Sequence, residues 1–473
     1  MPTLKVFPRR GATTSCNSTR RSERIVEKES PVAVDIETGL QGVSRRRVLS
    51  LFAHGLLAAA VGRPALAAAP SPVVVLTAYP EEVMARFEAA FEQAHPEYRL
   101  RLLWRMPHDA LPYLRQPRQG GVDVYWSASP RTFAQLAAEG RLQPLAIDRS
   151  GLPDHVGGAA LADPAGRFTA TEMAGYGFVV NDAALGPLGV KSPDDWAALA
   201  DPRLAGRIVL PNPARVGFAP VLVDIVLQAY GWEKGWALWS EIAGLATWVD
   251  SGGTFVSDEV GSGRAAVGVS IDFFVVSAIA NGAPLRFIYP SHGGINPAHI
   301  AITAEAANPE GARAFAAFVL SESGQRILAH ADIRKLPVRP AVYSALPPDY
   351  HDPFAAAARG AYDYDGVASR DRLPVVASVF EQMLVQGHDT LAGLWARIHA
   401  AEARGRDVSA ARKRLCAPLL SEHEAGVPNL HRRFRARLEG TQDQPRLREE
   451  IAWQWSAAKA RAAVRRLLEE AGA

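Results

Sequence analysis

Cysteine is nearly absent from this 473-residue sequence, which contains only Cys16 and Cys416. Cys16 falls in a segment that we expect to be removed, so the mature chain would keep a single thiol. A single thiol forms no internal disulfide and supports no cysteine-based metal site. A compartment that permits disulfides does not require them, so this scarcity leaves an oxidising location open. Cys416 lies on an apolar helical face, where we expect it to be inert packing.

Catalytic signatures are absent as well. The sequence has no H-E-x-x-H, no G-x-S-x-G, no Walker lysine loop and no cysteine pair. Five of its twelve histidines, at His95, His108, His155, His292 and His299, are scattered without metal-ligand spacing. We therefore expect a protein that is not an enzyme and that holds neither a metal nor a cofactor. An exported enzyme remains the rival from another functional class.

The apolar run from Leu51 to Val61 is too short to cross a membrane, which needs about 20 apolar residues. Ser44-Arg45-Arg46-Arg47-Val48-Leu49 precedes the run, and Ala65-Leu66-Ala67 follows it. Basic residues, a short apolar run and a small-residue site predict a secretory signal cleaved near Ala67. The paired arginines resemble the twin-arginine export signal. This predicts a periplasmic protein; a membrane anchor is the alternative, and whether residues 1–43 are translated stays open.

The formal charge of +3 is dominated by this leader. The first 67 residues contain 11 Lys and Arg against 5 Asp and Glu, so the remaining chain carries −3. No basic stripe with interleaved aromatic residues indicates a nucleic-acid partner. A chain of this length exceeds what one hydrophobic core organises, so we expect two or three domains.

Short apolar strands alternate with amphipathic helices from residue 73 to about 330. This alternation predicts an α/β fold with a mostly parallel sheet covered by helices on both faces. Ser192-Pro193-Asp194-Asp195 has the residues that open a helix. The expected strands are Val73–Leu76, Leu100–Trp104, Val122–Trp126, Gly177–Asn181, Arg207–Leu210, Ala266–Ile271, Leu285–Ile288 and His299–Thr303.

The sequence pattern changes beyond about residue 350, where strand-like runs end and two long helical stretches follow. They span Val375 to Ala403 and Arg446 to Glu470. The first carries an apolar stripe that suits packing over a neighbouring domain. We expect the basic run at residues 432–437 to be a solvated helix face rather than a docking site for an acidic partner.

Four stretches in the middle of the chain together resemble the periplasmic solute-binding proteins of ABC importers, and more narrowly the ferric-iron and organophosphate binding family. Their order and spacing carry the resemblance, which covers roughly Val73 to Val342. The stretches are residues 121–145 (GVDVYWS followed by LAAEGRLQPL), 175–181 (GYGFVVN), 251–268 (SGGT followed by GSGRAAVG) and 308–325 (NPEGA followed by FAAFVLSESGQ).

This resemblance implies a type II fold of two α/β lobes with the ligand held between them. We expect lobe 1 at residues 68–175 plus about 290–345, lobe 2 at 176–289, and an α-helical extension at 346–473, after the leader at 1–67. It also implies a monomer that delivers its ligand to an ABC permease. Residues 363–383 resemble the longer, phosphoglycerate-regulatory members, so a periplasmic ligand-sensing protein that acts with a membrane sensor is an alternative.

The iron-binding branch of the family uses adjacent tyrosines after the strand that ends here at Ile271. This chain has Asp272-Phe273-Phe274 at that place. Phenolate suits a trivalent cation, whereas a phenyl ring ligates nothing. A ferric-iron binder is therefore only a minor alternative. Asp272 would either meet a cationic group of the ligand or cap the following helix.

Capture of an anion is better supported by the residue types. Ser251-Gly252-Gly253-Thr254 precedes an expected helix, where backbone N–H groups and hydroxyls favour negative charge. Ser127 and Ser129 offer a similar helix start in lobe 1. Arg215 stands between a strand and a helix, where a guanidinium grips phosphate or carboxylate. An ordinary capped turn or a surface charge would explain these residues equally simply.

Aromatic side chains would supply the apolar walls of such a site. Tyr79 follows the first strand, Tyr176 lies at the expected crossover between lobes, and Phe273 follows Asp272. Core packing is the competing role for each of them. The sequence thus predicts an extracytoplasmic protein that binds a small organic anion, such as a phosphonate, phosphate ester or carboxylate. The solute itself is not specified.

Overall fold

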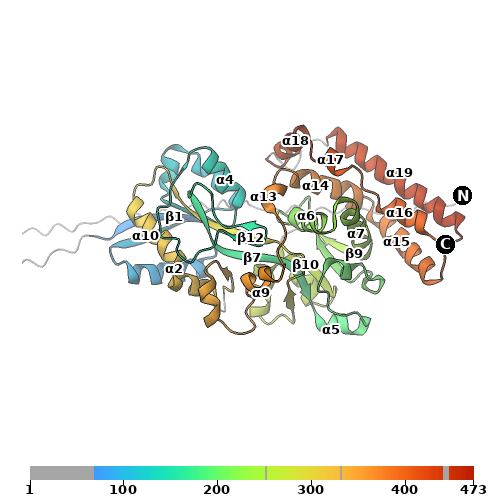
Figure 1. The fold of residues 1–473 in the computed structure, drawn as a ribbon, viewed down its shortest axis with the longest axis horizontal. Coiled ribbons are helices and arrows are strands. Elements are labelled where there is room, and N and C mark those ends of the chain that lie inside the picture. Colours follow the sequence, from blue (N-terminus) through green and yellow to red (C-terminus); the bar gives the residue numbers. More distant parts are fainter. Residues whose placement is uncertain (1–68, 251–252, 331–332, 440–446) are drawn as a thin grey trace, which may run out of the picture. The chain divides into compact units, whose positions relative to one another are not determined.

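The computed structural model describes residues 69–250, 253–330, 333–439 and 447–473. The expected leader, its cleavage site and Ser251 lie outside these ranges. The described chain forms two α/β lobes followed by a helical extension (Figure 1). This confirms the expected fold class.

The sheet of lobe 1 is built on three parallel strands. β1 (Ser71–Thr77) pairs with β2 (Tyr98–Trp104) on one side and with β3 (Val124–Ser127) on the other. β12 (Ile295–Thr303) then runs antiparallel to β3 and continues the sheet toward β7 (Phe168–Val180). The short strands β4 (Leu142–Gln143) and β13 (Leu336–Pro337) pair with β12 and β7. The carboxyl ends of β1, β2 and β3 consequently meet at one edge.

Strand β7 belongs to both lobes. Its residues Phe168 to Gly175 pair with β12, and its residues Tyr176 to Val180 pair with β10 (Val267–Ile271). Lobe 2 continues from β10 to β8 (Ile208–Pro211) and β9 (Ala246–Val249) in parallel, while β11 (Arg286–Ile288) pairs with the far half of β7. A small hairpin joins β5 (His155–Val156) to β6 (Ala159–Ala160). One continuous strand therefore connects the two sheets (Figure 1).

Helices follow the strands in both lobes. Lobe 1 contains α2 (Glu81–Ala94), α3 (Pro107–Leu114), α4 (Pro130–Ala138), α10 (Pro309–Leu320) and α11 (Glu322–Leu328). Lobe 2 contains α5 (Asp182–Leu185), α6 (Ala219–Tyr230), α7 (Trp232–Leu245), α8 (Gly253–Gly261) and α9 (Asp272–Ala280). The phenylalanines of α2 show how a helical face is buried: Phe87 and Phe91 are fully buried, as their spacing of four predicts.

Three sequence-based expectations were wrong. The sheets are mixed rather than mostly parallel, because β12 runs antiparallel to β3 and β7 in lobe 1 and β7 runs antiparallel to β10 and β11 in lobe 2. β7 begins at Phe168, nine residues before the expected strand, since its lobe 1 half contains a buried glutamate and threonines that disguise the apolar run. Ser192 opens no α-helix. A 3₁₀ turn at Trp196–Ala200 follows instead, and its first residue, Trp196, is buried.

The extension comprises short helices and two long ones. They are α12 (Pro353–Ala358), α13 (Gly366–Ser369), α14 (Leu373–Phe380), α15 (His388–Ala403), α16 (Ser409–Cys416), α17 (Glu422–Ala425), α18 (Pro428–Glu439) and α19 (Arg448–Glu470). The expected helix from Val375 to Ala403 is broken by a π turn at Glu381–Val385 and by Gly387, whose φ of 72° ends the helical conformation. None of the helices in the described ranges is both long and apolar enough to cross a lipid bilayer.

The extension shares a hydrophobic core with lobe 2. Trp395 of α15 is fully buried, and its ring packs against Gly244 of α7, where no side chain would fit. Its indole N–H donates to Ser240 Oγ at 3.3 Å. Asp224 of α6 is also fully buried and pairs with Arg372 at 2.8 Å. These contacts support the expectation that α14 and α15 pack over lobe 2; the expected domain limits themselves stay a prediction.

We expect Trp395→Ala to lower the free energy of unfolding by about 3–5 kcal/mol, the usual loss when a buried aromatic ring is truncated. Urea titration followed by circular dichroism measures this change. Trp455→Ala on the exposed face of α19 is the matched control, and its effect should stay within about 0.5 kcal/mol. Equal effects of the two variants would show that the extension is not part of the lobe 2 core.

Candidate functional site

The candidate site lies where the two lobes meet, beside the shared strand β7. It starts at the carboxyl ends of the lobe 1 strands, where ligands of α/β proteins bind. Tyr79 follows β1 and packs edge-on against Trp126 of β3, with ring centres 4.9 Å apart. Ser127 ends β3; its hydroxyl is buried and has no hydrogen-bond partner within the described residues. Tyr79 and Ser127 therefore both lie at this edge of the lobe 1 sheet.

A buried carboxyl group, Glu172, faces Tyr79 from β7. The Tyr79 hydroxyl donates to one Glu172 oxygen and the Thr171 hydroxyl donates to the other. The Trp126 indole N–H in turn donates to Thr171 Oγ1 at 2.8 Å. Glu172 is 1% exposed, and this burial raises the pKa of its carboxyl group. Burial also raises the pKa of Tyr79, so its phenol keeps the proton that it donates.

A second buried carboxyl group, Asp272, enters from lobe 2. It is the first residue of α9 and is 2% exposed. Its Oδ2 accepts the Gly175 backbone N–H at 2.7 Å and the Tyr289 hydroxyl at 3.0 Å. Burial raises the pKa of Asp272 to about 6, although these donors and the charge of Lys335 act in the opposite direction. Asp272 thus binds the backbone of the crossover strand.

Lys335 supplies the positive charge of the site. It precedes β13 in lobe 1, and its Nζ lies 3.9 Å from the centre of the Phe273 ring of lobe 2. The same Nζ lies 5.8 Å from the Tyr79 ring centre. Among the residues that the structure describes, no carboxylate lies within ion-pair distance of it and no acceptor hydrogen-bonds to it. Burial lowers the pKa of the Lys335 ammonium, while the charges of Glu172 and Asp272 raise it.

We call Tyr79, Glu172, Asp272, Phe273, Tyr289 and Lys335 the interlobe cluster. Residues at the start of the extension pack against this cluster. The His351 ring stacks on Tyr289 with centres 3.6 Å apart, and His351 hydrogen-bonds to the Tyr362 hydroxyl. Gly175 allows the arrangement, since a side chain there would collide with the Tyr289 ring.

The other predicted residues lie in different surroundings. Ser129 occupies the N-cap position of α4, but its hydroxyl bonds to Thr132 Oγ1 at 2.8 Å instead of capping the helix. Tyr176 is buried at the start of the lobe 2 half of β7. Arg215 is exposed on the turn between β8 and α6. Gly253 and Thr254 begin α8, as the expected helix start requires, while Ser251 lies outside the described residues.

Glu172, Tyr289 and Lys335 were not identified from the sequence. Glu172 had a usable signal, because an acid inside a run of strand residues must be paired or protonated when buried. Lys335 lies in a loop with no motif, and only the pairing of β13 with β7 brings it to lobe 2. No local pattern connects Tyr289 to Asp272.

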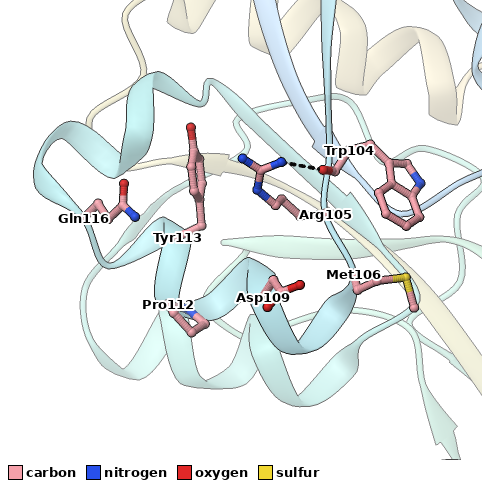
Figure 2. Close-up of a pocket in the computed structure, with 7 residues that line it drawn as sticks. All are labelled: Trp104, Arg105, Met106, Asp109, Pro112, Tyr113 and Gln116. Atoms are coloured by element: carbon pink, nitrogen blue, oxygen red, sulfur yellow. Dashed lines mark hydrogen bonds between the residues drawn. The ribbon is translucent and has the colours of Figure 1, made fainter. Parts of the chain in front are cut away.

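A hollow of about 430 Å³ opens elsewhere in lobe 1, at the end of β2 and along α3. Figure 2 shows Arg105 between Trp104 and Tyr113 in its wall. The Arg105 guanidinium donates to the Trp104 carbonyl at 2.9 Å and lies 5.0 Å from the Tyr113 ring centre. Its walls come from one lobe only and include none of the interlobe cluster. Within the described ranges, no group of three or more His, Cys, Asp or Glu residues could hold a metal ion.

Comparison with known proteins agrees with this architecture. The family model described as bacterial extracellular solute-binding protein matches residues 122–357, about half of the chain. The chain belongs to this family of solute-binding proteins. The phosphoglycerate transport regulatory protein PgtC of Salmonella typhimurium is 29% identical to this solute-binding protein over 235 residues, which are 50% of this chain and 58% of PgtC. The match thus spans a little over half of that relative.

Two solved structures show the same fold. Iron-bound HitA from Pseudomonas aeruginosa superposes with a TM-score of 0.50 at 14% identity, covering 61% of this solute-binding protein and 92% of HitA. The periplasmic binding protein AfuA from Actinobacillus pleuropneumoniae, with fructose-6-phosphate bound, gives a TM-score of 0.50 at 18% identity, covering 67% and 99% of the two chains. At such identities the likeness concerns the fold and not the ligand.

Asp272→Asn tests the buried carboxyl group. An asparagine oxygen can keep both hydrogen bonds but never ionises. In the unchanged protein the folded state holds the Asp272 proton up to about pH 6, whereas the unfolded chain releases it near pH 3.8. Stability must therefore fall as pH rises from about 4 to 6, by about 3 kcal/mol for this group. The variant should lose this part of the pH dependence and be more stable at pH 7.

Urea titrations between pH 4 and pH 7 measure the difference. Asp258→Asn, on the exposed side of α8, is the control and should keep the pH dependence of the unchanged protein. A variant that is less stable than the unchanged protein at pH 7 would show that Asp272 is better ionised than neutral in the fold.

Proposed function

We propose that this solute-binding protein binds a small organic anion between its lobes and delivers it to an ABC importer from the periplasm. One observation carries the proposal: the Lys335 ammonium lies against lobe 2 without an ion-pair or hydrogen-bond partner in the described chain. A partly buried charge without a partner is costly, because it has lost water and gained no acceptor. An anionic ligand group would supply the missing acceptor.

The surrounding residues favour an anion over a cation. Glu172 is held toward its neutral form by burial and accepts two hydroxyl hydrogen bonds, so it adds little negative charge. Asp272 spends one oxygen on Gly175 and Tyr289 of the protein itself. The Phe273 ring lies under the Lys335 ammonium and holds it in place by a cation–π contact. Lys335 is thus the group of the cluster that is free to bind a ligand.

A phosphorylated solute is the first candidate, and related proteins supply the support. PgtC carries phosphoglycerate transport in its name, and AfuA was solved with fructose-6-phosphate. HitA was solved with iron, so a ferric ligand is a weaker candidate. The position of the iron-branch tyrosines holds Asp272 and Phe273 here, and Phe273 contacts Lys335 instead of a metal.

A ligand-sensing role beside a membrane sensor is the second candidate. It is favoured by the chain of contacts from Asp272 through Tyr289 and His351 to Tyr362, which leads from the interlobe cluster into the extension. A movement of Asp272 together with lobe 2 would change these contacts. Transport and sensing both need the same ligand-binding step.

Lys335→Met should weaken anion binding by roughly 10- to 100-fold, because a hydrogen bond to a charged group contributes about 1.5–3 kcal/mol. Methionine keeps most of the apolar stem over Phe273. Calorimetric titration with 3-phosphoglycerate and fructose-6-phosphate measures the affinity, after a thermal-shift screen of phosphorylated and carboxylated compounds. A ligand at 100 times its dissociation constant should stabilise the protein by about 2.7 kcal/mol.

Lys191→Met, at an exposed lysine of lobe 2, is the matched control and should bind like the unchanged protein. Arg215→Ala decides whether the exposed arginine after β8 takes part: a loss of similar size would assign it to the ligand, and unchanged affinity would leave it as surface charge. The proposal would be wrong if ferric salts gave the only thermal shift, or if Lys335→Met bound every anion as tightly as the unchanged protein.

A further inference from the structure

The C-terminal part of the extension, residues 404–473, differs in charge from the rest of the protein. Residues 404–473 contain 15 Lys and Arg against 9 Asp and Glu, a formal charge of +6. Residues 68–403 contain 26 Lys and Arg against 35 Asp and Glu, a formal charge of −9. The protein beyond its expected leader is therefore electrically polar, with a basic C-terminal end on an acidic body.

Several basic side chains of the extension are used inside the protein. Arg412 pairs with Glu241 of α7 and Glu402 of α15, both at 2.7 Å. The buried Arg461 donates to the Met383 carbonyl at 2.6 Å. The run at residues 432–437, expected to be a solvated face, also holds helices together through the ion pairs Arg433–Glu449 and Arg435–Asp371.

A second set of basic side chains lies on the outer face of α19. Arg448, Lys459 and Arg466 are separated by 11 and 7 residues, so they point in nearly the same direction at 100° per residue. All three are exposed, and within the described part of the chain they have neither an ion pair nor a hydrogen bond. They span 18 residues, a length of about 27 Å at 1.5 Å per residue.

Apolar side chains stand on the same face. Trp455 is 66% exposed and Ile451 is 45% exposed, one helical turn apart. Trp453, two residues earlier than Trp455, points the other way and stacks on Phe434 of α18 at 5.4 Å. Exposed tryptophan is uncommon in a protein whose other large rings are mostly packed. Trp455 therefore contributes little to packing and presents most of its ring to the surroundings.

A groove continues this face between α19 and α16, which lie side by side (Figure 1). It has a volume of about 510 Å³. Lys413 and Arg414 of α16 line it together with Arg466 and Glu470 of α19, and alanines and Leu467 supply its apolar surface. Lys413 and Arg414 are exposed and, like Arg466, have no acidic partner within the described chain. The groove thus combines an apolar surface with three basic side chains and one carboxylate, a net positive lining.

We propose that this face docks on the surface of a membrane that contains anionic phospholipids. The docking face consists of Arg448, Ile451, Trp455, Lys459 and Arg466 of α19 with Lys413 and Arg414 of α16. Its basic side chains would meet lipid phosphates, Trp455 and Ile451 would enter the headgroup region, and the groove would take a phospholipid headgroup. Tryptophan between basic residues suits the interface of a bilayer.

The charge distribution favours a membrane surface over an acidic protein. A bilayer offers many phosphates at no fixed geometry, which suits long, unpaired side chains spread over about 27 Å of one helix. The acidic body would be repelled by the same anionic surface, so the polarity of the molecule would orient the extension toward the lipid. The face is built outside the interlobe cluster, so docking would leave ligand binding unaffected.

Vesicle sedimentation with the full chain tests the proposal. The protein should bind vesicles of phosphatidylglycerol and phosphatidylethanolamine in equal parts and fail to bind phosphatidylcholine. Replacing Lys413, Arg414, Lys459 and Arg466 together by alanine should weaken binding by about 100-fold or more, since each basic residue near an anionic surface contributes about fivefold. Trp455→Ala should weaken it by roughly tenfold.

The control variant replaces four exposed basic residues outside the docking face by alanine, namely Arg101, Lys191, Lys234 and Arg359. Every variant keeps the same leader, so a difference in vesicle binding between the two quadruple variants must result from the docking face. Equal binding of both would overturn the proposal, as would equal binding to phosphatidylcholine. Binding to polyglutamate but not to vesicles, lost in the docking-face variant, would assign the face to an acidic protein and equally overturn it. Calorimetric titration of each variant with 3-phosphoglycerate and fructose-6-phosphate separates these outcomes from a failure of ligand binding.

Discussion

The structure depends on one strand that hydrogen-bonds into two sheets. β7 pairs with β12 up to Gly175 and with β10 from Tyr176, so a single peptide unit separates its two roles. Both halves must satisfy their backbone groups while they are buried. The backbone N–H of Gly175 falls at the change of partners, and the carboxyl group of Asp272 accepts it at 2.7 Å. A side chain from lobe 2 thereby completes the hydrogen bonding of the crossover.

The polar character of the interlobe cluster follows from this constraint. Carboxyl groups that accept buried hydrogen bonds are themselves desolvated, which raises the pKa of both Glu172 and Asp272. Lys335 is attracted to these two groups without reaching either one. Its ammonium rests on the Phe273 ring, and so the same arrangement that supports the crossover leaves a cation available to the anionic ligand that we propose.

The extension makes two sets of contacts with the rest of the molecule. Its inner helices complete the core of lobe 2, with Trp395 against Gly244 and Arg372 against the buried Asp224. Its first residues reach the interlobe cluster through the stacking of His351 on Tyr289. The outer face of α19 takes part in neither role, and there the basic and aromatic side chains remain exposed. Packing accounts for the inner side chains, and the membrane docking proposed above would account for the outer ones.

The sequence by itself determined the class of the fold and most elements, because apolar periodicity and helix-start residues are local signals. β10 and β11 begin one residue later than expected and end at the expected residue, and β8 is displaced by one residue at both ends. It also placed Tyr79 and Asp272 at the ends of strands. Only the tertiary structure decided which of these residues meet. Glu172 is hidden inside a strand pattern, and Lys335 reaches Phe273 from more than 60 positions away in the sequence. Such contacts depend on how two sheets share β7, which no local pattern of residues encodes.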